Sequence, residues 1–136
     1  VLNSPEPRTP EDEEIMRQHT LLGARMLEEL DAYRDEDFVR VAYQICRWHH
    51  ERYDGSGYPD QLVGEQIPIA AQVVGLADAY ETLTTGSGSQ PPVPCAAAVQ
   101  MLCTGEAGAF NPVLLDCLRE IENEIDDTMR RRPETL

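Results

Sequence analysis

Two adjacent histidines, His49 and His50, open the stretch 49–59, whose sequence is HHERYDGSGYP. Imidazole binds first-row transition metals, and carboxylates beside it extend the choice to iron and manganese. Successive residues on a helix point about 100° apart, so we expect these two side chains to reach two neighbouring ions, or one ion and one substrate, rather than to chelate one ion together. The pair therefore predicts a multinuclear metal site.

Three turn residues, Gly55, Gly57 and Pro59, follow the histidines. Glycine and proline at this density are typical of a defined turn, so we expect the preceding helix to end before a loop. A glycine-rich turn can also cradle a phosphate, but this one has neither the lysine nor the strand-to-helix context of a P-loop. It is therefore weak evidence for phosphate binding.

His19 and Asp78 are the other two candidate metal ligands. A histidine near the end of a helix can simply complement the helix dipole, and this alternative applies to His49 and His50 as well. Asp78 lies in a strongly apolar stretch, where a carboxylate is costly unless it is paired, and a metal ion would satisfy it. A hydrogen bond to Tyr80 or to a neighbouring helix end is the alternative for Asp78.

Helical periodicity predicts the elements that must position these residues. Thr9 and Pro10 suit the N-cap and the first position of a helix, and the apolar pattern continues over Ile15–Leu30 with a break near His19–Thr20. Further helices are expected at about 35–50, 69–83 and 94–103, and from a second cap-plus-proline start at Asn111–Pro112. Since no stretch alternates as a strand does, the sequence predicts one all-α domain over 1–136, with a flexible loop at 86–94.

The strongly acidic composition of the chain limits its partners. Its 136 residues carry a formal net charge of −14 at pH 7, and such a surface repels nucleic acid and anionic membranes. All 11 basic residues are arginines, and none lies between Tyr53 and Leu118. No apolar run has bilayer length and no basic, apolar leader opens the chain, so we expect a cytoplasmic protein without membrane insertion.

The four cysteines, Cys46, Cys95, Cys103 and Cys117, show no CxxC spacing. They lie in apolar helical stretches, so we expect small core residues in a reducing compartment rather than a zinc or redox site. A hydrophobic fraction of 41% also fits an ordinary globular domain.

The stretch 49–59 resembles the signature of the HD-GYP phosphodiesterases, which hydrolyse the bacterial messenger cyclic di-GMP. Segment 9–19 is similar to the family's helix ending in a ligand histidine, 64–80 resembles the segment with its ligand aspartate, and 105–112 looks like its late turn and helix start. The match covers nearly the whole chain in the right order. The resemblance implies four metal ligands in this sequence: His19, His49, His50 and Asp78.

The resemblance also implies features that the given sequence does not contain. The family's His-Asp pair, with a lysine after it, lies just before the segment matching residues 1–3, and this sequence has no His-Asp dipeptide and no lysine. We therefore expect an HD-domain-like helical bundle, incomplete on its N-terminal side, whose apolar face on Ile15–Leu30 promotes assembly into a homo-oligomer. The remaining ligands are expected to hold one divalent transition metal, iron, manganese, zinc or nickel, or none.

Two functions stay open at this point. The first is a truncated or degenerate cyclic di-GMP phosphodiesterase, inactive alone, with Arg52 near the substrate. The second is a non-catalytic signalling module whose loop residues Gly55, Gly57, Tyr58 and Pro59 bind a partner such as a diguanylate cyclase domain, because the resemblance associates this loop with such contacts. A receiver domain is a further expected partner. The segment without basic residues favours degeneration, whereas the retained histidines favour a fragment of an active enzyme.

Overall fold

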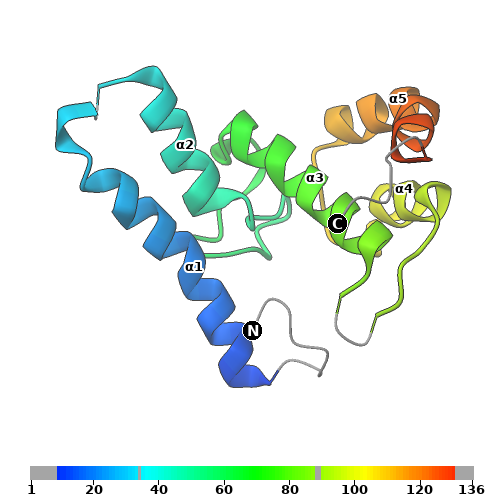
Figure 1. The fold of residues 1–136 in the computed structure, drawn as a ribbon, viewed down its shortest axis with the longest axis horizontal. Coiled ribbons are helices and arrows are strands. Elements are labelled where there is room, and N and C mark those ends of the chain that lie inside the picture. The colour runs from blue at the N-terminus through cyan, green and yellow to red at the C-terminus, as the bar shows by residue number, and fades with distance from the viewer. Residues whose placement is uncertain (1–8, 34, 88–89, 131–136) are drawn as a thin grey trace.

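Five α-helices build the part of the chain that this computed structural model describes, residues 9–33, 35–87 and 90–130 (Figure 1). In chain order they are α1 (Pro10–Glu28), α2 (Asp37–Trp48), α3 (Ile69–Thr85), α4 (Cys95–Thr104) and α5 (Pro112–Arg130). Two short 3-10 helices lie between them, η1 (Asp31–Tyr33) and η2 (Gly64–Gln66). The described ranges contain isolated β-bridges and no β-strand, so the predicted all-α fold is confirmed.

Two other predictions concern the chain as a whole. The single domain was predicted over 1–136, and its ends at 1–8 and 131–136 lie outside the described residues, as do 88–89 of the predicted flexible loop. Among the described helices, none is long and apolar enough to cross a membrane.

Local sequence signals start two of the helices as predicted. At α1, Thr9 Oγ1 accepts a hydrogen bond from the backbone N–H of Asp12, and the Asp12 carboxylate accepts one from the N–H of Thr9 at 3.0 Å. This capping box satisfies N–H groups that have no partner inside the helix. At α5, Asn111 Oδ1 accepts a hydrogen bond from the backbone N–H of Val113 at 3.0 Å, and Pro112 is the first residue of the helix.

One predicted feature of α1 is wrong. The expected break near His19–Thr20 is absent, because α1 runs without interruption to Glu28. Thr20 is buried, and its hydroxyl donates to the carbonyl of Arg17 at 2.9 Å, so the polar side chain is satisfied inside the helix. His19 therefore lies in the middle of α1, and the helix-dipole explanation for this histidine does not apply.

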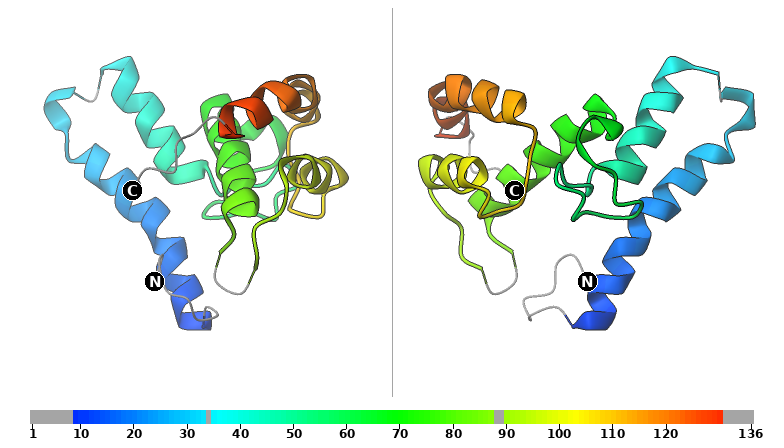
Figure 2. Two further views of the ribbon diagram at one scale, coloured as in Figure 1. Left: turned by 45° about the vertical axis from the view of Figure 1, so that its right-hand side comes forward. Right: turned by 180° about the vertical axis from the view of Figure 1, so that it is seen from behind.

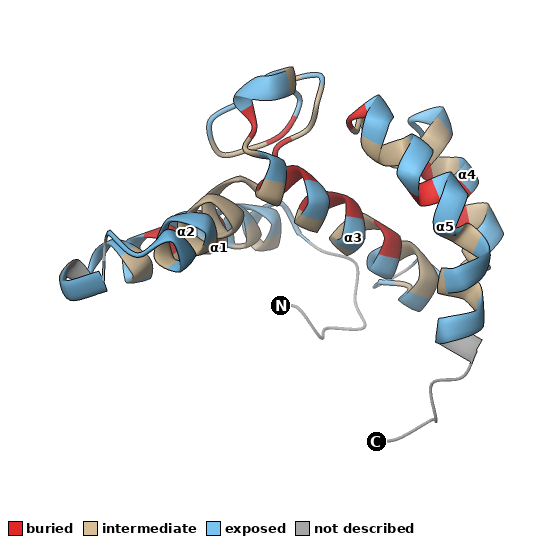
Figure 3. Cartoon of the chain, turned by 90° about the horizontal axis from the view of Figure 1, so that it is seen from above, coloured by how far each residue is buried: buried red, intermediate tan, exposed pale blue. Residues whose placement is uncertain are grey.

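The helices α1 and α2 form an antiparallel hairpin, and α3 connects this hairpin to α4 and α5 (Figures 1 and 2). The loop between α2 and α3 lies where α1, α2 and α3 meet, as the view from behind in Figure 2 shows. Viewed from above, buried positions gather along α3 and on the neighbouring helices, while the hairpin is mostly exposed or half-buried (Figure 3).

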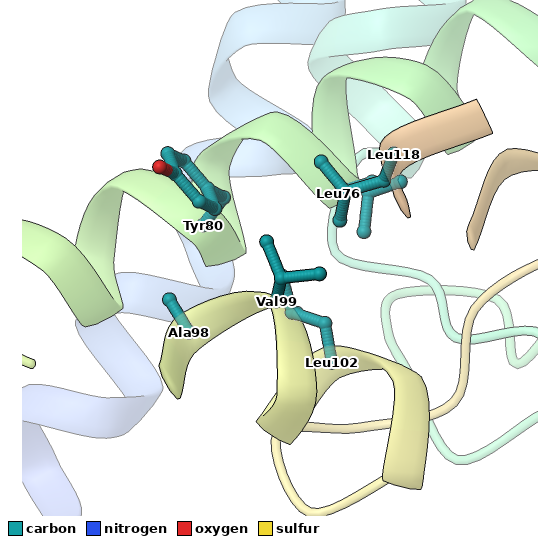
Figure 4. Packing of buried hydrophobic residues seen from close by; sticks show 6 residues of the cluster. All are labelled: Leu76, Tyr80, Ala98, Val99, Leu102 and Leu118. Carbon is teal, nitrogen blue, oxygen red and sulfur yellow. The ribbon is translucent and has the colours of Figure 1, made fainter. Parts of the chain in front are cut away.

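The core lies between α3, α4 and α5 (Figure 4). Its buried members are Leu76 and Tyr80 of α3, Ala98, Val99 and Leu102 of α4, and Leu118 of α5. Leu102 is 0% exposed. The core therefore fixes the helix α3, which carries one of the predicted metal ligands.

The predicted core role of the cysteines is wrong for one of the four. Cys46, Cys95 and Cys103 are half-buried, but Cys117 is exposed on α5, and all four are free thiols. Along an amphipathic helix, positions on the buried face and on the exposed face follow each other within a few residues, so an apolar neighbourhood in the sequence does not ensure burial.

Candidate metal centre

Three histidines come together at the junction of α1, α2 and the following loop. His19 projects from the middle of α1, His49 is the C-cap of α2, and His50 follows directly. Each offers one ring nitrogen, and these three atoms lie within 4.8 Å of one another. The distance between the Nε2 atoms of His19 and His49 is 3.2 Å. The fold thus gathers three of the four predicted ligands into one cluster.

The expectation that His49 and His50 cannot share one ion is wrong for this geometry. The last residue of α2 is Trp48, and His49, its C-cap, still has helical backbone angles and donates its N–H to the carbonyl of Ile45. The centroids of the two imidazole rings are 4.1 Å apart, and both rings also lie close to the ring of His19. The backbone turn after α2 therefore turns both side chains towards the same space.

Backbone carbonyls fix the orientation of two of the rings. Nδ1 of His49 donates to the carbonyl of Ile45 at 2.7 Å, and Nδ1 of His19 donates to the carbonyl of Met16. A carbonyl only accepts, so each Nδ1 carries the hydrogen, and in the neutral rings Nε2 keeps its lone pair. This is the usual outer support of a metal-binding histidine. His49 thus combines the capping contact and the ligand geometry, which the sequence had left as alternatives.

The facing nitrogen atoms fit a transition-metal ion. With both rings neutral, two Nε2 lone pairs face each other across 3.2 Å with no hydrogen between them. Two ligand nitrogens at about 2.0–2.1 Å from one ion lie about 2.8–3.4 Å apart for angles between octahedral and tetrahedral. Burial lowers the pKa of His49, and the nearby His19 ring lowers this pKa further, which favours the neutral, metal-binding form.

Asp78 lies on α3 and lines the same cavity as the three histidines. Its carboxylate acts on the charge of His49, but it is not part of the compact three-histidine cluster. The alternative of a hydrogen bond to Tyr80 is not realised among the described residues, because the group beside the buried Tyr80 hydroxyl is the thiol of Cys95 and not the carboxylate of Asp78. Asp78 as a metal ligand stays a prediction.

Glu51, the carboxylate next to the histidines, has another role than widening the choice of metal. It is buried, and its two oxygens accept hydrogen bonds from the backbone N–H groups of Asp60 (2.6 Å) and Leu62 (3.0 Å). Both oxygens are thus used to close the loop. The sequence gave no local signal for this role, because the partners lie nine and eleven residues further along the chain.

The predicted loop residues differ in their exposure. Gly57 is buried, and Gly55, Tyr58 and Pro59 are half-buried. The ring of Tyr58 stacks on His50, with centroids 5.0 Å apart and planes 19° apart. The inner part of the loop therefore contacts the histidine cluster instead of extending into solvent.

Arg52 places a positively charged side chain in a fixed position at the wall of the cavity. Its guanidinium lies 5.0 Å from the centre of the Phe110 ring and donates to the carbonyl of Glu51 at 3.2 Å. Gly108 leaves room for it, since a Cβ there would come within 3.1 Å of Arg52 Nε. Burial lowers the pKa of Arg52, but a guanidinium stays charged at neutral pH.

These groups surround one cavity of about 660 Å³. Besides the histidines, Arg52, Tyr58 and Asp78, its wall contains Met16, Ala79, Thr82, Leu83, Gln90, Met101, Glu106 and Ala107. Arg52 is the one arginine among the described residues of this wall. The cavity is therefore poor in protein cations and rich in imidazole, and an anionic ligand would depend on a bound metal ion for most of its neutralisation.

Comparisons with known proteins agree with this site. The model of the HD domain family matches residues 1–113. The chain belongs to the HD domain family. It is 32% identical over 131 residues to a cyclic di-GMP phosphodiesterase of Thermotoga maritima, covering 96% of this chain and 34% of that protein. A probable cyclic di-GMP phosphodiesterase of Vibrio cholerae is 35% identical, covering 93% of this chain and 29% of that protein.

A third relative is a cyclic di-GMP phosphodiesterase response regulator of Xanthomonas campestris pv. campestris. It is 35% identical, over 87% of this chain and 30% of that protein. The chain thus spans about a third or less of the length of these curated relatives. The resemblance to the HD-GYP phosphodiesterases is confirmed, and the HD family is one of metal-dependent phosphohydrolases that bind divalent metals.

Proposed function

We propose that this HD domain is the metal-binding part of a cyclic di-GMP phosphodiesterase site of the HD-GYP type. The observation that supports the proposal most is the facing pair of Nε2 atoms of His19 and His49, with His50 beside them. Three imidazoles whose ligand nitrogens lie within 4.8 Å of one another suit one divalent iron, manganese, zinc or nickel ion. Asp78, on the same cavity wall, is proposed as the carboxylate ligand.

The chain's own residues would hold the messenger next to the ion. A bound divalent ion would supply Lewis-acid neutralisation of a phosphate oxygen and make an attacking water easier to deprotonate. Arg52 donates to a second phosphate oxygen, because its planar guanidinium is already held by Phe110 and a backbone carbonyl. The apolar members of the wall, such as Leu83 and Met101, limit access of water to the bound diester.

We further propose that the given chain binds metal but does not hydrolyse cyclic di-GMP by itself. Three histidines and one aspartate suffice for one ion, with water in the open positions. They provide too few ligands for a bridged pair of ions that clamps both the attacking and the leaving oxygen. The sequence contains no His-Asp dipeptide and no lysine that would add to them.

The alternative of a partner-binding module stays a prediction. One observation weighs against the loop as its contact surface: Gly57 is buried and the Tyr58 ring stacks on a candidate metal ligand. Within the stretch 54–60 the exposed residues are Asp54, Ser56 and Asp60, of which two are acidic. A diguanylate cyclase or receiver domain as partner, and the cytoplasmic setting, remain proposals that rest on the family resemblance.

Metal content of the purified chain tests the first proposal. We expect about one iron, manganese or zinc ion per chain by elemental analysis, and a loss of affinity in His49→Ala beyond the 10–100-fold typical of a removed supporting residue. Gln18→Ala is the matched control, because Gln18 is an exposed neighbour of His19 outside the cavity. Absence of metal in the parent chain after incubation with each ion would contradict metal binding.

Turnover of cyclic di-GMP is measured on the same samples. With added manganese or ferrous iron, we expect no linear or mononucleotide product from either the parent chain or His49→Ala. Product from the parent that disappears in His49→Ala would show that the cluster is catalytic without further ligands, and would overturn the proposal of an inactive chain.

A further inference from the structure

The loop that follows the histidines is closed from inside by one carboxylate. Glu51 is 5% exposed and accepts from the backbone N–H groups of Asp60 at 2.6 Å and Leu62 at 3.0 Å. Hydrogen bonds to an ionised carboxylate are shorter and stronger than those between neutral groups. Their loss would leave two part-buried backbone N–H groups without these partners. Glu51 therefore links the start of the loop to its return at Asp60 and Leu62.

The middle of the closed loop packs closely against the backbone of residues 50–52, next to the candidate ligands. A Cβ added to Gly57 would lie 2.4–2.5 Å from backbone atoms of His50, Glu51 and Arg52, so only glycine fits there. The backbone N–H of Tyr58 donates to the carbonyl of His50 at 3.3 Å. This close approach places the next side chain of the loop, the ring of Tyr58, over the ring of His50.

Stacking by Tyr58 constrains the plane of the His50 ring. The two rings are 5.0 Å apart at an angle of 19°, whereas His50 meets His19 edge-on at 4.9 Å and 86°. The guanidinium of Arg17 lies 5.4 Å from the centre of the Tyr58 ring and covers it from α1. The Tyr58 ring is thus held between the first helix and the third histidine of the cluster.

We propose that Glu51 is a positioning residue of the metal centre: by closing the loop, it makes Tyr58 hold the His50 ring towards His19 and His49. The inference rests on the proposed function, since it assigns to the Gly-Tyr-Pro loop the orientation of a metal ligand. Glu51 touches neither metal nor substrate in this role, because it is buried and belongs neither to the cavity wall nor to the histidine cluster.

The affinity for Co²⁺, followed by its visible absorption, tests this role. Glu51→Gln keeps the shape of the side chain but places an amide N–H₂ against a backbone N–H, so the loop opens. We expect a loss of about tenfold or more in Co²⁺ affinity, the range typical of groups that support metal ligands. In the His50→Ala background the same substitution is expected to change the affinity by less than about twofold, because its effect passes through His50.

Glu65→Gln is the matched control for this substitution. Glu65 lies in the same loop, is exposed, and accepts from the hydroxyl of Tyr53 at 3.1 Å, away from the histidines. We expect no change in Co²⁺ affinity in this variant. Equal losses from Glu51→Gln with and without His50 would show a general structural role and overturn the proposal, as would an unchanged affinity.

A second measurement needs no metal and separates this inference from the proposed function. In the metal-free chain, the ring protons of His50 should show the upfield NMR shift caused by a stacked aromatic ring. We expect Glu51→Gln and Tyr58→Leu to abolish this shift, and Glu65→Gln to keep it. Failure of the parent chain to bind Co²⁺ would contradict the metal centre only, whereas an unchanged His50 shift in Tyr58→Leu or Glu51→Gln would overturn the positioning role.

Discussion

The α1–α2 hairpin and the α3–α5 half of the molecule differ in how far their apolar side chains are buried. Six core residues pack between α3, α4 and α5, whereas α2 has no buried residue and α1 has two, Thr20 and Ala24 (Figure 3). The hairpin instead exposes large apolar side chains: Ile15, Leu21, Leu22, Met26, Phe38 and Val41. Hydrophobic burial therefore stabilises one half of the described chain more than the other.

The candidate metal centre lies next to the boundary between these two halves. His19 belongs to the hairpin, Asp78 to α3, and His49 to the end of α2, where Gly75 of α3 comes so close that a Cβ would lie 2.4 Å from the carbonyl oxygen of His49. A ligand that binds the folded state alone stabilises it in proportion to the logarithm of its concentration over Kd. With Asp78 as its proposed fourth ligand, a bound metal ion would link the weakly packed hairpin to the core.

Truncating one leucine in each half should give the largest contrast. Leu102 is 0% exposed, so Leu102→Ala removes core contacts and leaves a cavity, which costs about 2–5 kcal/mol of unfolding free energy. Leu22 on α1 is 56% exposed, so Leu22→Ala should change this free energy by less than about 0.5 kcal/mol. Urea unfolding followed by far-UV circular dichroism measures both. Similar losses would show that the hairpin is packed as tightly as the core.

Contacts between neighbours in the sequence were the predictable part of this fold. The capping box at Thr9 and the proline start after Asn111 each depend on a few adjacent residues, and both helices begin where the sequence indicated. The predicted break near His19 was wrong, since Thr20 is buried and satisfies its hydroxyl inside a continuous helix. Burial of one side chain by a distant helix leaves no local signal.

The site follows the same rule. Histidine type and family spacing were enough to select His19, His49 and His50, which the fold does bring together. Whether His49 and His50 diverge or converge depends on the backbone at a helix end, which falls at Trp48 instead of about residue 50, and a sequence pattern does not fix helix ends that finely. The role of Glu51 depends on contacts across a whole loop, so it required the structure.

Adding one methyl group at Gly75 should disturb the contact between the two halves. In Gly75→Ala the new Cβ meets the backbone carbonyl of His49, which cannot rotate away as a side chain could, so α3 or the ligand segment must shift. We expect a loss of about 1–3 kcal/mol in unfolding free energy, typical of overpacking, together with weaker Co²⁺ binding. Urea unfolding and Co²⁺ titration measure the two effects.

Gly23→Ala is the corresponding change inside the hairpin. Its Cβ would meet the Cβ of Cys46 at 3.3 Å, a contact that a small movement relieves, and alanine favours the helix over glycine. We expect a smaller effect on unfolding than at Gly75 and unchanged Co²⁺ affinity. A larger loss of unfolding free energy in Gly23→Ala than in Gly75→Ala would show that α1 and α2 are packed more tightly against each other than the hairpin is against α3. This result would contradict the comparison of the two halves.

The smallest effect on stability is expected from the exposed face of α1. Met26 is 71% exposed, so Met26→Ala should leave the unfolding free energy of the monomer within about 0.5 kcal/mol of the parent. The predicted homo-oligomer, however, would use this apolar face, since unburied apolar patches drive association. Sedimentation velocity over a range of concentrations should therefore show weaker self-association for Met26→Ala, and no change for the polar control Gln18→Ala. A parent chain that stays monomeric at all concentrations would show that the hairpin tolerates its exposed apolar side chains without a partner copy.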